Sequence, residues 1–485
     1  MHSTLQFKPN SSSHSALPPR RRRALAVAGL LTAALALGGC ATGTAAGGTG
    51  AGQDAGVARL ALGTKATYPG APANQELAAP PAGFEPVLVE HVARHGSRLL
   101  SSKKYDDLIL QLWELARDAD ALTETGAKLG PVVEEITAAH EELGYGSLSG
   151  LGEREHLDMA ARVQDRMEPL FAAAAKDGTA ITITTSGVDR AVESAKSFAA
   201  GLAAAQTGLE AVIGAPVADP ETLYFHDSDE DYNAYIEDDP QLAQTLDAVE
   251  SNPETEEVAR TVLEKLFAPD FLDTLDSGAI DLVDRGDGDK HLESGVDAAM
   301  YLYELFVIAP GMAAEHPIEF EEFLSPDDAL KLSIVSESED FYEKGPGMKG
   351  NDVTYSMAGV LLADMLDAVA GVRTGQTTQA ADFRFAHAEE IIPLAALLQL
   401  PGSTQQQDPQ ALFSHANNEW RGAEVAPMGA NIQWDVFADA DNNVLVRMLY
   451  NEKVIPFAHG CTPVESGSTF YSDTELARCL SPLMD

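Results

Sequence analysis

Short apolar runs rich in β-branched residues alternate with amphipathic helical patterns in the first part of this chain, and this alternation restricts the fold more than any other feature. Residues 86–92 and 180–185 have the length and composition of buried strands. Helical spacing follows them, over residues 105–118 and 153–174 after the first and 189–205 after the second. Strands that alternate with helices predict a mainly parallel α/β sheet.

The alternation stops between residues 215 and 345, where Asp and Glu become dense and helical patterns dominate. It resumes with a helix around residues 357–369 and a strand at 382–386 that leads into a further helix. Near the C-terminus, two strand patterns at 431–437 and 444–450 flank a turn and predict a hairpin.

These patterns predict an α/β core that is built from two separated parts of the chain. We assign residues 81–214 and 346–485 to this core and residues 215–345 to a helical insertion domain. In a parallel α/β sheet, chemistry takes place beyond the carboxyl ends of the strands, so the residues that follow each strand deserve the closest reading.

The N-terminus has the pattern of an export signal. Four arginines at 20–23 precede an apolar stretch at 24–37 that is too short to span a bilayer comfortably. It ends in Leu37-Gly38-Gly39-Cys40, which resembles the lipobox of bacterial lipoproteins, where the cysteine is lipidated after cleavage. We expect a signal peptide over residues 1–40; a plain signal peptide with an accidental cysteine is the alternative.

Lipidation of Cys40 would hold the exported protein on the outer face of a bacterial membrane, as a cell-surface lipoprotein. Residues 41–80 are rich in Ala, Gly, Thr and Pro and predict a flexible tether. No later segment looks apolar enough to span a membrane, and the four arginines leave both general and twin-arginine export open.

The chain is strongly acidic, with 75 acidic against 32 basic residues and a net charge of -43. Such a surface repels nucleic acid and anionic membranes, so neither is expected as a partner beyond the lipid anchor. An anionic substrate must then be captured by a locally basic pocket against the field of the whole protein.

The strand at residues 86–92 runs into Arg94-His95-Gly96-Ser97-Arg98. Guanidinium groups bind phosphate oxygens as forks, and a neutral imidazole between them can attack phosphorus. The glycine would let the backbone approach an anion and direct its amide inward. The alternative is a surface loop with a capping histidine.

Arg-His-Gly-x-Arg resembles the signature of the histidine acid phosphatase branch of the histidine phosphatase superfamily, which also follows the first strand in that family. The resemblance implies that His95 is a nucleophile that forms a phosphohistidine, while Arg94 and Arg98 hold the phosphoryl oxygens. Residues 184–190 resemble the segment that supplies a third phosphate-binding arginine, here Arg190.

The strand at 382–386 leads into His387-Ala388-Glu389. Most histidine acid phosphatases have His-Asp here, whereas His-Ala-Glu resembles the multiple inositol polyphosphate phosphatases. That resemblance covers roughly residues 84–480 and implies that His387 contacts phosphate and Glu389 protonates the leaving alkoxide. An alkoxide needs an acid held protonated, so we expect burial among phosphates to raise the pKa of Glu389; Glu390 should point away.

Other residues have weaker assignments. Lys103, Lys104 and Lys344 are candidate substrate-binding cations, with solvated surface lysines as the alternative. In an oxidising compartment Cys461 and Cys479 are expected to form a disulfide, with two buried thiols as the alternative.

No metal site is expected. The two cysteines have no zinc-ligand pattern around them. The acidic stretches at 227–239 and 284–289 lack the spacing of a calcium loop and are interpreted as solvated turns.

The resemblance therefore implies a phosphomonoester hydrolase that acts on inositol polyphosphates, phytate above all, and needs no cofactor. We expect a monomer, although no sequence feature determines the oligomeric state. One rival is a broad-specificity acid or sugar phosphatase on the same scaffold. The other is a lipoprotein that binds inositol phosphates without hydrolysing them; it would not need the proton donor.

Overall fold

The computed structural model describes residues 50–72, 77–286, 288 and 290–484. Contacts divide the chain into a unit of residues 1–54 and a unit of residues 55–485. Of the first unit only residues 50–54 are described, at the start of helix α1 (Gly50–Leu60). The expected signal peptide and Cys40 therefore lie outside the described residues.

An eight-stranded sheet forms the centre of the second unit, with β1 (Glu85–Arg94) in its middle. β1 pairs in parallel with β6 (Gln379–Ala386), and β6 in parallel with β2 (Ala180–Thr185). On its other side β1 pairs antiparallel with β7 (Asn431–Ala438), which forms a hairpin with β8 (Val444–Tyr450). The predicted α/β class and the C-terminal hairpin are confirmed.

Three short strands complete this sheet at its edges: β3 (Val217–Ala218), β9 (Lys453–Ile455) and β10 (Tyr471–Ser472). The parallel half of the sheet, β1, β6, β2 and β3, is the half whose carboxyl ends lead to the predicted site residues.

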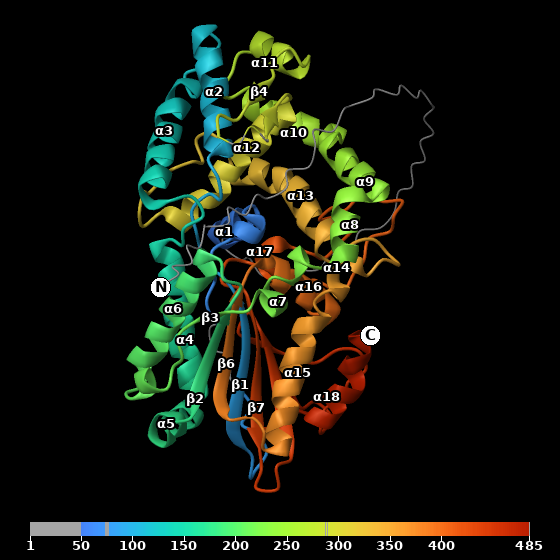
Figure 1. Ribbon diagram of the computed structural model, residues 1–485. Helices are drawn as coiled ribbons and strands as arrows, with labels where there is room; N and C mark the ends of the chain where they lie inside the picture. The colour runs from blue at the N-terminus through green and yellow to red at the C-terminus, as the bar shows by residue number, and fades with distance from the viewer. Residues whose placement is uncertain (1–49, 73–76, 287, 289, 485) are drawn as a thin grey trace, which may run out of the picture. The chain divides into compact units, whose positions relative to one another are not determined.

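Helices cover both faces of the sheet (Figure 1). The alternation along β1 explains why, because Leu88 and Val92 point to one face, and Val89 and Ala93 to the other, and all four are fully buried. The helices on the Val89 face are α4 (Gly150–Arg166), α5 (Glu168–Asp177) and α6 (Asp189–Ala205). Those on the Leu88 face are α15 (Gly359–Thr374), α16 (Ala388–Leu397) and α18 (Asp473–Leu480).

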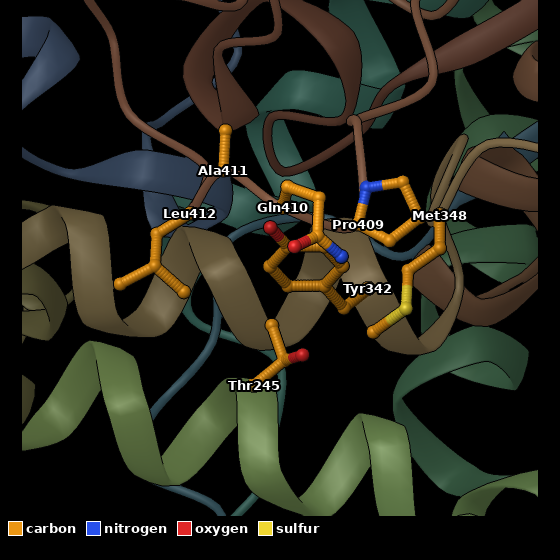
Figure 2. Close-up of a pocket in the computed structure, with 7 residues that line it drawn as sticks. All are labelled: Thr245, Tyr342, Met348, Pro409, Gln410, Ala411 and Leu412. Carbon is orange, nitrogen blue, oxygen red and sulfur yellow. The ribbon is translucent and has the colours of Figure 1, made fainter.

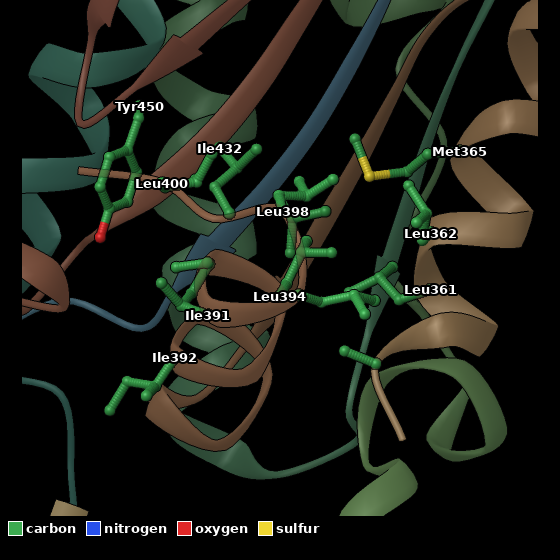
Figure 3. Close-up of a cluster of buried hydrophobic side chains, with 14 of the residues drawn as sticks. Leu361, Leu362, Met365, Ile391, Ile392, Leu394, Leu398, Leu400, Ile432 and Tyr450 are labelled. Carbon is green, nitrogen blue, oxygen red and sulfur yellow. The ribbon is translucent and has the colours of Figure 1, made fainter. Parts of the chain in front are cut away.

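Figure 3 shows the packing on the Leu88 face. Leu361 and Met365 of α15 meet Leu394 of α16 beside Ile432 of β7, and all four side chains are fully buried. The segment Val353–Thr374, which contains α14 (Val353–Ser356) and α15, is long and apolar enough to cross a membrane by length and composition. The sequence-based statement that no later segment is so apolar was wrong. Part of the apolar character of this segment is explained by core packing, since Leu361, Leu362 and Met365 are buried in it.

The single helix predicted over residues 153–174 is two helices, α4 and α5, which meet at Met167. Pro169 stands in the first turn of α5, where its missing N–H is tolerated. Inside a continuous helix its ring would clash with the carbonyl of residue 165. Proline therefore ends the first helix and starts the second.

A helical cluster packs beside the core and is larger than the predicted insertion. It includes α2 (Lys104–Asp118) and α3 (Gly126–Leu143), which the sequence-based boundaries placed in the core. Residues Leu108 and Leu112 of α2 are fully buried in this cluster together with Leu302 of α12. Its other helices are α10 (Pro253–Leu263), α11 (Pro269–Asp276), α12 (Gly295–Ile308) and the start of α13 (Pro326–Glu343).

The first helices after residue 215 instead pack on the core cluster on the Leu88 face. They are α7 (Pro220–Leu223), α8 (Glu230–Asp238) and α9 (Pro240–Glu250). Asp219, Asp229 and Asp239 cap their N-termini by accepting backbone N–H bonds. Part of the acidic density of this region is therefore helix capping rather than solvated turn.

The flexible tether predicted over residues 41–80 does not extend through its described part. Ala61 and Ala66 are fully buried, and the short 3-10 helix η1 (Gly63–Lys65) lies between them. Met428 N donates to Ala66 O at 2.9 Å, and Tyr303 Oη donates to Ala61 O at 3.0 Å. The sequence pattern indicated a linker because these residues are small. In the structure their small side chains allow the chain to pack closely against its neighbours.

The predicted disulfide is confirmed. Cys461 and Cys479 are joined, and the bond ties the chain after β9 to α18. Since α18 packs on α15, the bond fixes the end of the chain to the Leu88 face of the sheet.

Candidate active site

The carboxyl ends of β1, β6 and β2 bring the predicted site residues together. Arg94 pairs with Ala386 in register, so the chain leaves β1 and β6 at the same level. His95 N donates to Ala386 O at 2.9 Å, and Ser186 N donates to Phe385 O at 3.1 Å. The rings of His95 and His387 consequently lie side by side, with centroids 5.4 Å apart.

The surroundings of His95 favour a neutral imidazole. Its Nδ1 lies 2.9 Å from Gly96 O, and because a carbonyl oxygen only accepts, Nδ1 carries the proton and Nε2 of the neutral ring keeps its lone pair. Burial lowers the pKa of His95 well below its ordinary value, and the guanidinium groups of Arg190 and Arg94 lower it further. A neutral ring with a lone pair on Nε2 has the chemistry of a nucleophile.

Helix α4 packs against the loop that carries His95 and fixes its position. A Cβ on Gly96 would lie 2.6 Å from Gly152 O, so the two backbones touch. Glu155 accepts from Ser97 N at 2.7 Å and from Ser97 Oγ at 2.8 Å. The Gly96 amide donates to Ser194 Oγ at 3.1 Å, so the prediction that it points to an anion was wrong; packing against α4 requires the glycine.

Three buried donor atoms around the His95 ring have no hydrogen-bond partner among the described residues. They are Nε of Arg94, Arg98 and Arg190, and Nδ1 of His387 is a fourth buried nitrogen without a partner. Buried donors are normally satisfied, and leaving one without a partner costs about 1–3 kcal/mol. Three guanidinium donors beside one imidazole have the chemistry to bind an anion.

His387 is held by its neighbours on two sides. Its Nε2 lies 2.8 Å from Ser186 Oγ, and its backbone N donates to Glu390 Oε2 at 2.8 Å. The other oxygen of Glu390 lies 2.9 Å from His226 Nδ1. Glu390 is fully buried and both its oxygens are engaged, so it supports the site and is not placed to protonate a substrate.

Glu389 lies at the start of α16 with its side chain 32% exposed. Burial acts to raise the pKa of Glu389, but Lys344, 3.0 Å away, together with His226 and His387, holds it well below its ordinary value. The sequence-based expectation of a raised pKa is therefore wrong for the site without a bound phosphate, because cations surround the carboxylate.

Of the three candidate lysines, Lys344 joins the site. Its ammonium lies 3.1 Å from Asp340 and 3.0 Å from Glu389. Lys103 forms an exposed ion pair with Glu141 instead. Lys104 lies over the ring of Tyr105, 5.4 Å from its centroid.

Several contributing residues were not among the predicted site residues. Ser186, Glu155 and His226 reach the site from three different elements, and spacing along the chain does not connect them, although Ser186 lies in the segment 184–190 that resembles a family motif. Although burial lowers the pKa of His226, its pairing with Glu390 and the nearby Glu389 raise it above its ordinary value. The neighbouring carboxylates therefore favour the protonated form of His226.

A separate pocket lies between α9, α13 and the loop at residues 409–412 (Figure 2). Thr245, Tyr342 and Met348 line it together with that loop, and none of its lining side chains is charged. It does not have the chemistry to bind a phosphate ester, unlike the group around His95.

The fold and the histidine flanked by arginines define a class of protein. Residues 88–451 match the model of the histidine phosphatase superfamily (branch 2), and the chain belongs to that family. The predicted family and the prediction of a phosphatase are thereby confirmed.

Particular relatives agree with the predicted subfamily. A chicken protein named multiple inositol polyphosphate phosphatase 1 is 23% identical over 397 residues, covering 78% of this chain and 79% of the relative. The multiple inositol polyphosphate phosphatase of Bifidobacterium longum, solved with inositol hexasulfate, is 34% identical with a TM-score of 0.82. The match covers 87% of this chain and 97% of that one; the same enzyme with phosphate gives a TM-score of 0.84.

Proposed function

We propose that this protein hydrolyses phosphomonoesters of inositol polyphosphates, phytate above all, through a phosphohistidine on His95. The observation that carries the proposal is the set of three unpartnered buried guanidinium donors, with the ring of His387, around a neutral histidine. The names of the related enzymes support the choice of substrate.

In the first step the lone pair on His95 Nε2 attacks phosphorus. A nitrogen–phosphorus bond forms, the bond from phosphorus to the inositol oxygen breaks, and the carboxyl of Glu389 gives its proton to that oxygen. Arg94, Arg98, Arg190 and His387 stabilise the charge on the transferring phosphoryl group.

In the second step water attacks the phosphohistidine. The carboxylate of Glu389 takes a proton from water, the new oxygen–phosphorus bond forms and the nitrogen–phosphorus bond breaks. Inorganic phosphate leaves, His95 recovers its lone pair and Glu389 is again protonated. Its position next to Lys344 keeps the carboxyl oriented through both steps.

The decisive experiment measures phosphate release from phytate, glucose 1-phosphate and p-nitrophenyl phosphate by the full chain. We expect phytate to be hydrolysed with the highest kcat/KM. His95→Ala should abolish release from all three with unchanged thermal unfolding, whereas His316→Ala, at the surface beside Glu135, should act like the wild type. Phytate turnover by His95→Ala would contradict the mechanism.

The same measurement tests the rivals. Preference for glucose 1-phosphate or the aryl ester would favour a sugar phosphatase or a broad-specificity acid phosphatase. Tight phytate binding without phosphate release would favour a binding lipoprotein. The order in which inositol phosphate isomers appear over time then gives the position of attack.

We further propose that the mature chain is a monomer, exported and held on the outer face of a bacterial membrane by lipid on Cys40. The run Leu37-Gly38-Gly39-Cys40 after the apolar stretch supports this. Cys40→Ser should move the protein from the membrane fraction to the soluble fraction, and light scattering of that variant should give the monomer mass. An unchanged membrane fraction would refute the anchor.

A further inference from the structure

Residues 57–68, the C-terminal part of α1 with η1 and the chain after it, lie against the active site. Thr64 is only 4% exposed, and its neighbours Ala61 and Ala66 are fully buried. A Cβ on Gly422 would lie 2.7 Å from Thr64 N, so the backbones of η1 and α17 (Gly422–Val425) are in contact. This segment is therefore held at a fixed position rather than resting on the surface.

Thr64 contacts the first phosphate-binding arginine. Arg94 Nη1 donates to Thr64 O at 2.6 Å and to Ala426 O at 2.5 Å. Two carbonyl acceptors on one nitrogen fix the plane of the guanidinium group. Arg94 Nε has no partner among the described residues and remains available as a donor.

Thr64 is also connected to the part of the site that contains Glu389. Its Oγ1 donates to Asp340 Oδ2 at 2.8 Å, and the other oxygen of Asp340 lies 3.1 Å from Lys344 Nζ. Lys344 in turn lies 3.0 Å from Glu389 Oε1. A continuous chain of polar contacts therefore runs from Thr64 to the carboxyl of Glu389.

We propose that Thr64 is a positioning residue that sets Arg94 through its carbonyl and Glu389 through Asp340 and Lys344. The segment at 57–68 then contributes to catalysis through Thr64. This inference rests on the proposed function in that it takes Glu389 as the proton donor.

The Thr64 hydroxyl affects the position of Lys344 through Asp340. Without it, Asp340 Oδ2 loses its donor, and a carboxylate buried with one fewer hydrogen bond attracts the shared ammonium of Lys344 more strongly. Lys344 then moves toward Asp340 and away from Glu389. The proton donor loses its fixed position, while Arg94, which binds the Thr64 carbonyl, keeps its own.

The chemistry of the leaving group distinguishes the role of Thr64 through Glu389 from its role through Arg94. An inositol alkoxide must be protonated as it leaves, whereas p-nitrophenolate leaves without a proton. Positioned general acids contribute about 10²–10⁴-fold, so partial loss of position should cost about tenfold on phytate. The first turnover of the aryl ester precedes the step in which Glu389 takes a proton from water. Its rate should stay within about twofold of the wild type, because phosphate binding by the arginines is kept.

The experiment compares Thr64→Ala, Thr64→Ser and Thr67→Ala in the full chain, with KM and the rate of the first turnover measured on phytate, glucose 1-phosphate and p-nitrophenyl phosphate. Thr67 is the matched control from the same segment. We expect Thr64→Ala to lower the first-turnover rate on phytate about tenfold with little change in KM and with the first-turnover rate on the aryl ester spared. Thr64→Ser should restore the rate, and Thr67→Ala should resemble the wild type.

Equal losses of the first-turnover rate on phytate and the aryl ester, or no recovery in Thr64→Ser, would overturn the proposal. If Thr64→Ala does not fold, Thr64→Val, which keeps the shape of threonine and removes the hydroxyl, must show the same selective loss. Glu389→Gln tests the proton donor separately from Thr64. Selective loss in Glu389→Gln without any in Thr64→Ala refutes the role of Thr64 alone, whereas no selectivity in either refutes Glu389 as proton donor.

Discussion

Replacing Gly96 by alanine separates two explanations for the glycine between His95 and Ser97. The sequence suggested close approach to an anion, whereas the structure shows contact with Gly152. The new Cβ would lie 2.6 Å from Gly152 O, against 3.4 Å for ordinary contact, so the loop and α4 must separate by about 0.8 Å. Overpacking of this kind costs about 1–3 kcal/mol, and displacing a nucleophile by this distance costs about 10²-fold in rate.

The matched variant is Gly152→Ala, on the opposite side of the same contact, whose Cβ would lie 2.2 Å from Ser97 O. We expect both variants to lose similar stability in urea unfolding and similar kcat on p-nitrophenyl phosphate. Gly56→Ala, with no atom within 4 Å of the new Cβ, is the control. Wild-type behaviour of Gly152→Ala beside an inactive Gly96→Ala would refute packing as the reason for the glycine.

Two further predictions concern charge and covalent links. In Lys344→Met the pKa of Glu389 should rise, because the ammonium that lowers it is gone. The alkaline limb of the pH profile of kcat/KM on phytate should therefore move to higher pH. Lys103→Met is the control and should leave the pH profile unchanged. An unmoved limb in Lys344→Met would show that Lys344 does not control the acid. Reducing the disulfide between Cys461 and Cys479, which are 18 residues apart, should lower the free energy of unfolding by about 3 kcal/mol, measured with and without reductant; equal values would show that the bond adds no stability.

The elements that the sequence predicted well are those whose pattern is local. The strand at 180–185 and the helix at 189–205 match β2 and α6, because periods of 2 and 3.6 residues are visible within one element. The same patterns do not show which element packs on which. Helices α2 and α3 were assigned to the core by chain order, but their apolar faces complement α10 and α12.

The residues of the candidate site also divide into those that the sequence predicts and those that it does not. His95, Arg190 and His387 could be predicted because their motifs resemble those of a known family and each follows a strand. Parallel strands bring those strand ends together. Thr64 and Glu155 could not be predicted, because their roles depend on contacts with distant parts of the chain. The direction of the pKa shift of Glu389 failed for this reason, since Lys344 lies 45 residues away in sequence.

Buried arginines elsewhere in this acidic chain have carboxylate partners. Arg384, only 2% exposed, pairs with Glu90, Asp364 and Asp382. Arg98 has a different environment, since its Nη1 donates to Leu99 O and its Nε has no partner among the described residues. Burial, followed by the repulsion of Arg190 and Arg94, lowers the pKa of Arg98 to about 10. The site therefore holds uncompensated positive charge that a phosphate dianion would neutralise.

Neutralising that charge should also protonate the acid. Without a phosphate, Lys344, His226 and His387 hold the pKa of Glu389 low; a bound dianion opposes their field and raises it. We therefore expect the alkaline limb on phytate to lie at higher pH in kcat, which reports the enzyme–substrate complex, than in kcat/KM, which reports the free enzyme. Coincident limbs would show that Glu389 does not respond to the bound phosphate, and the proton would then have to come from another group.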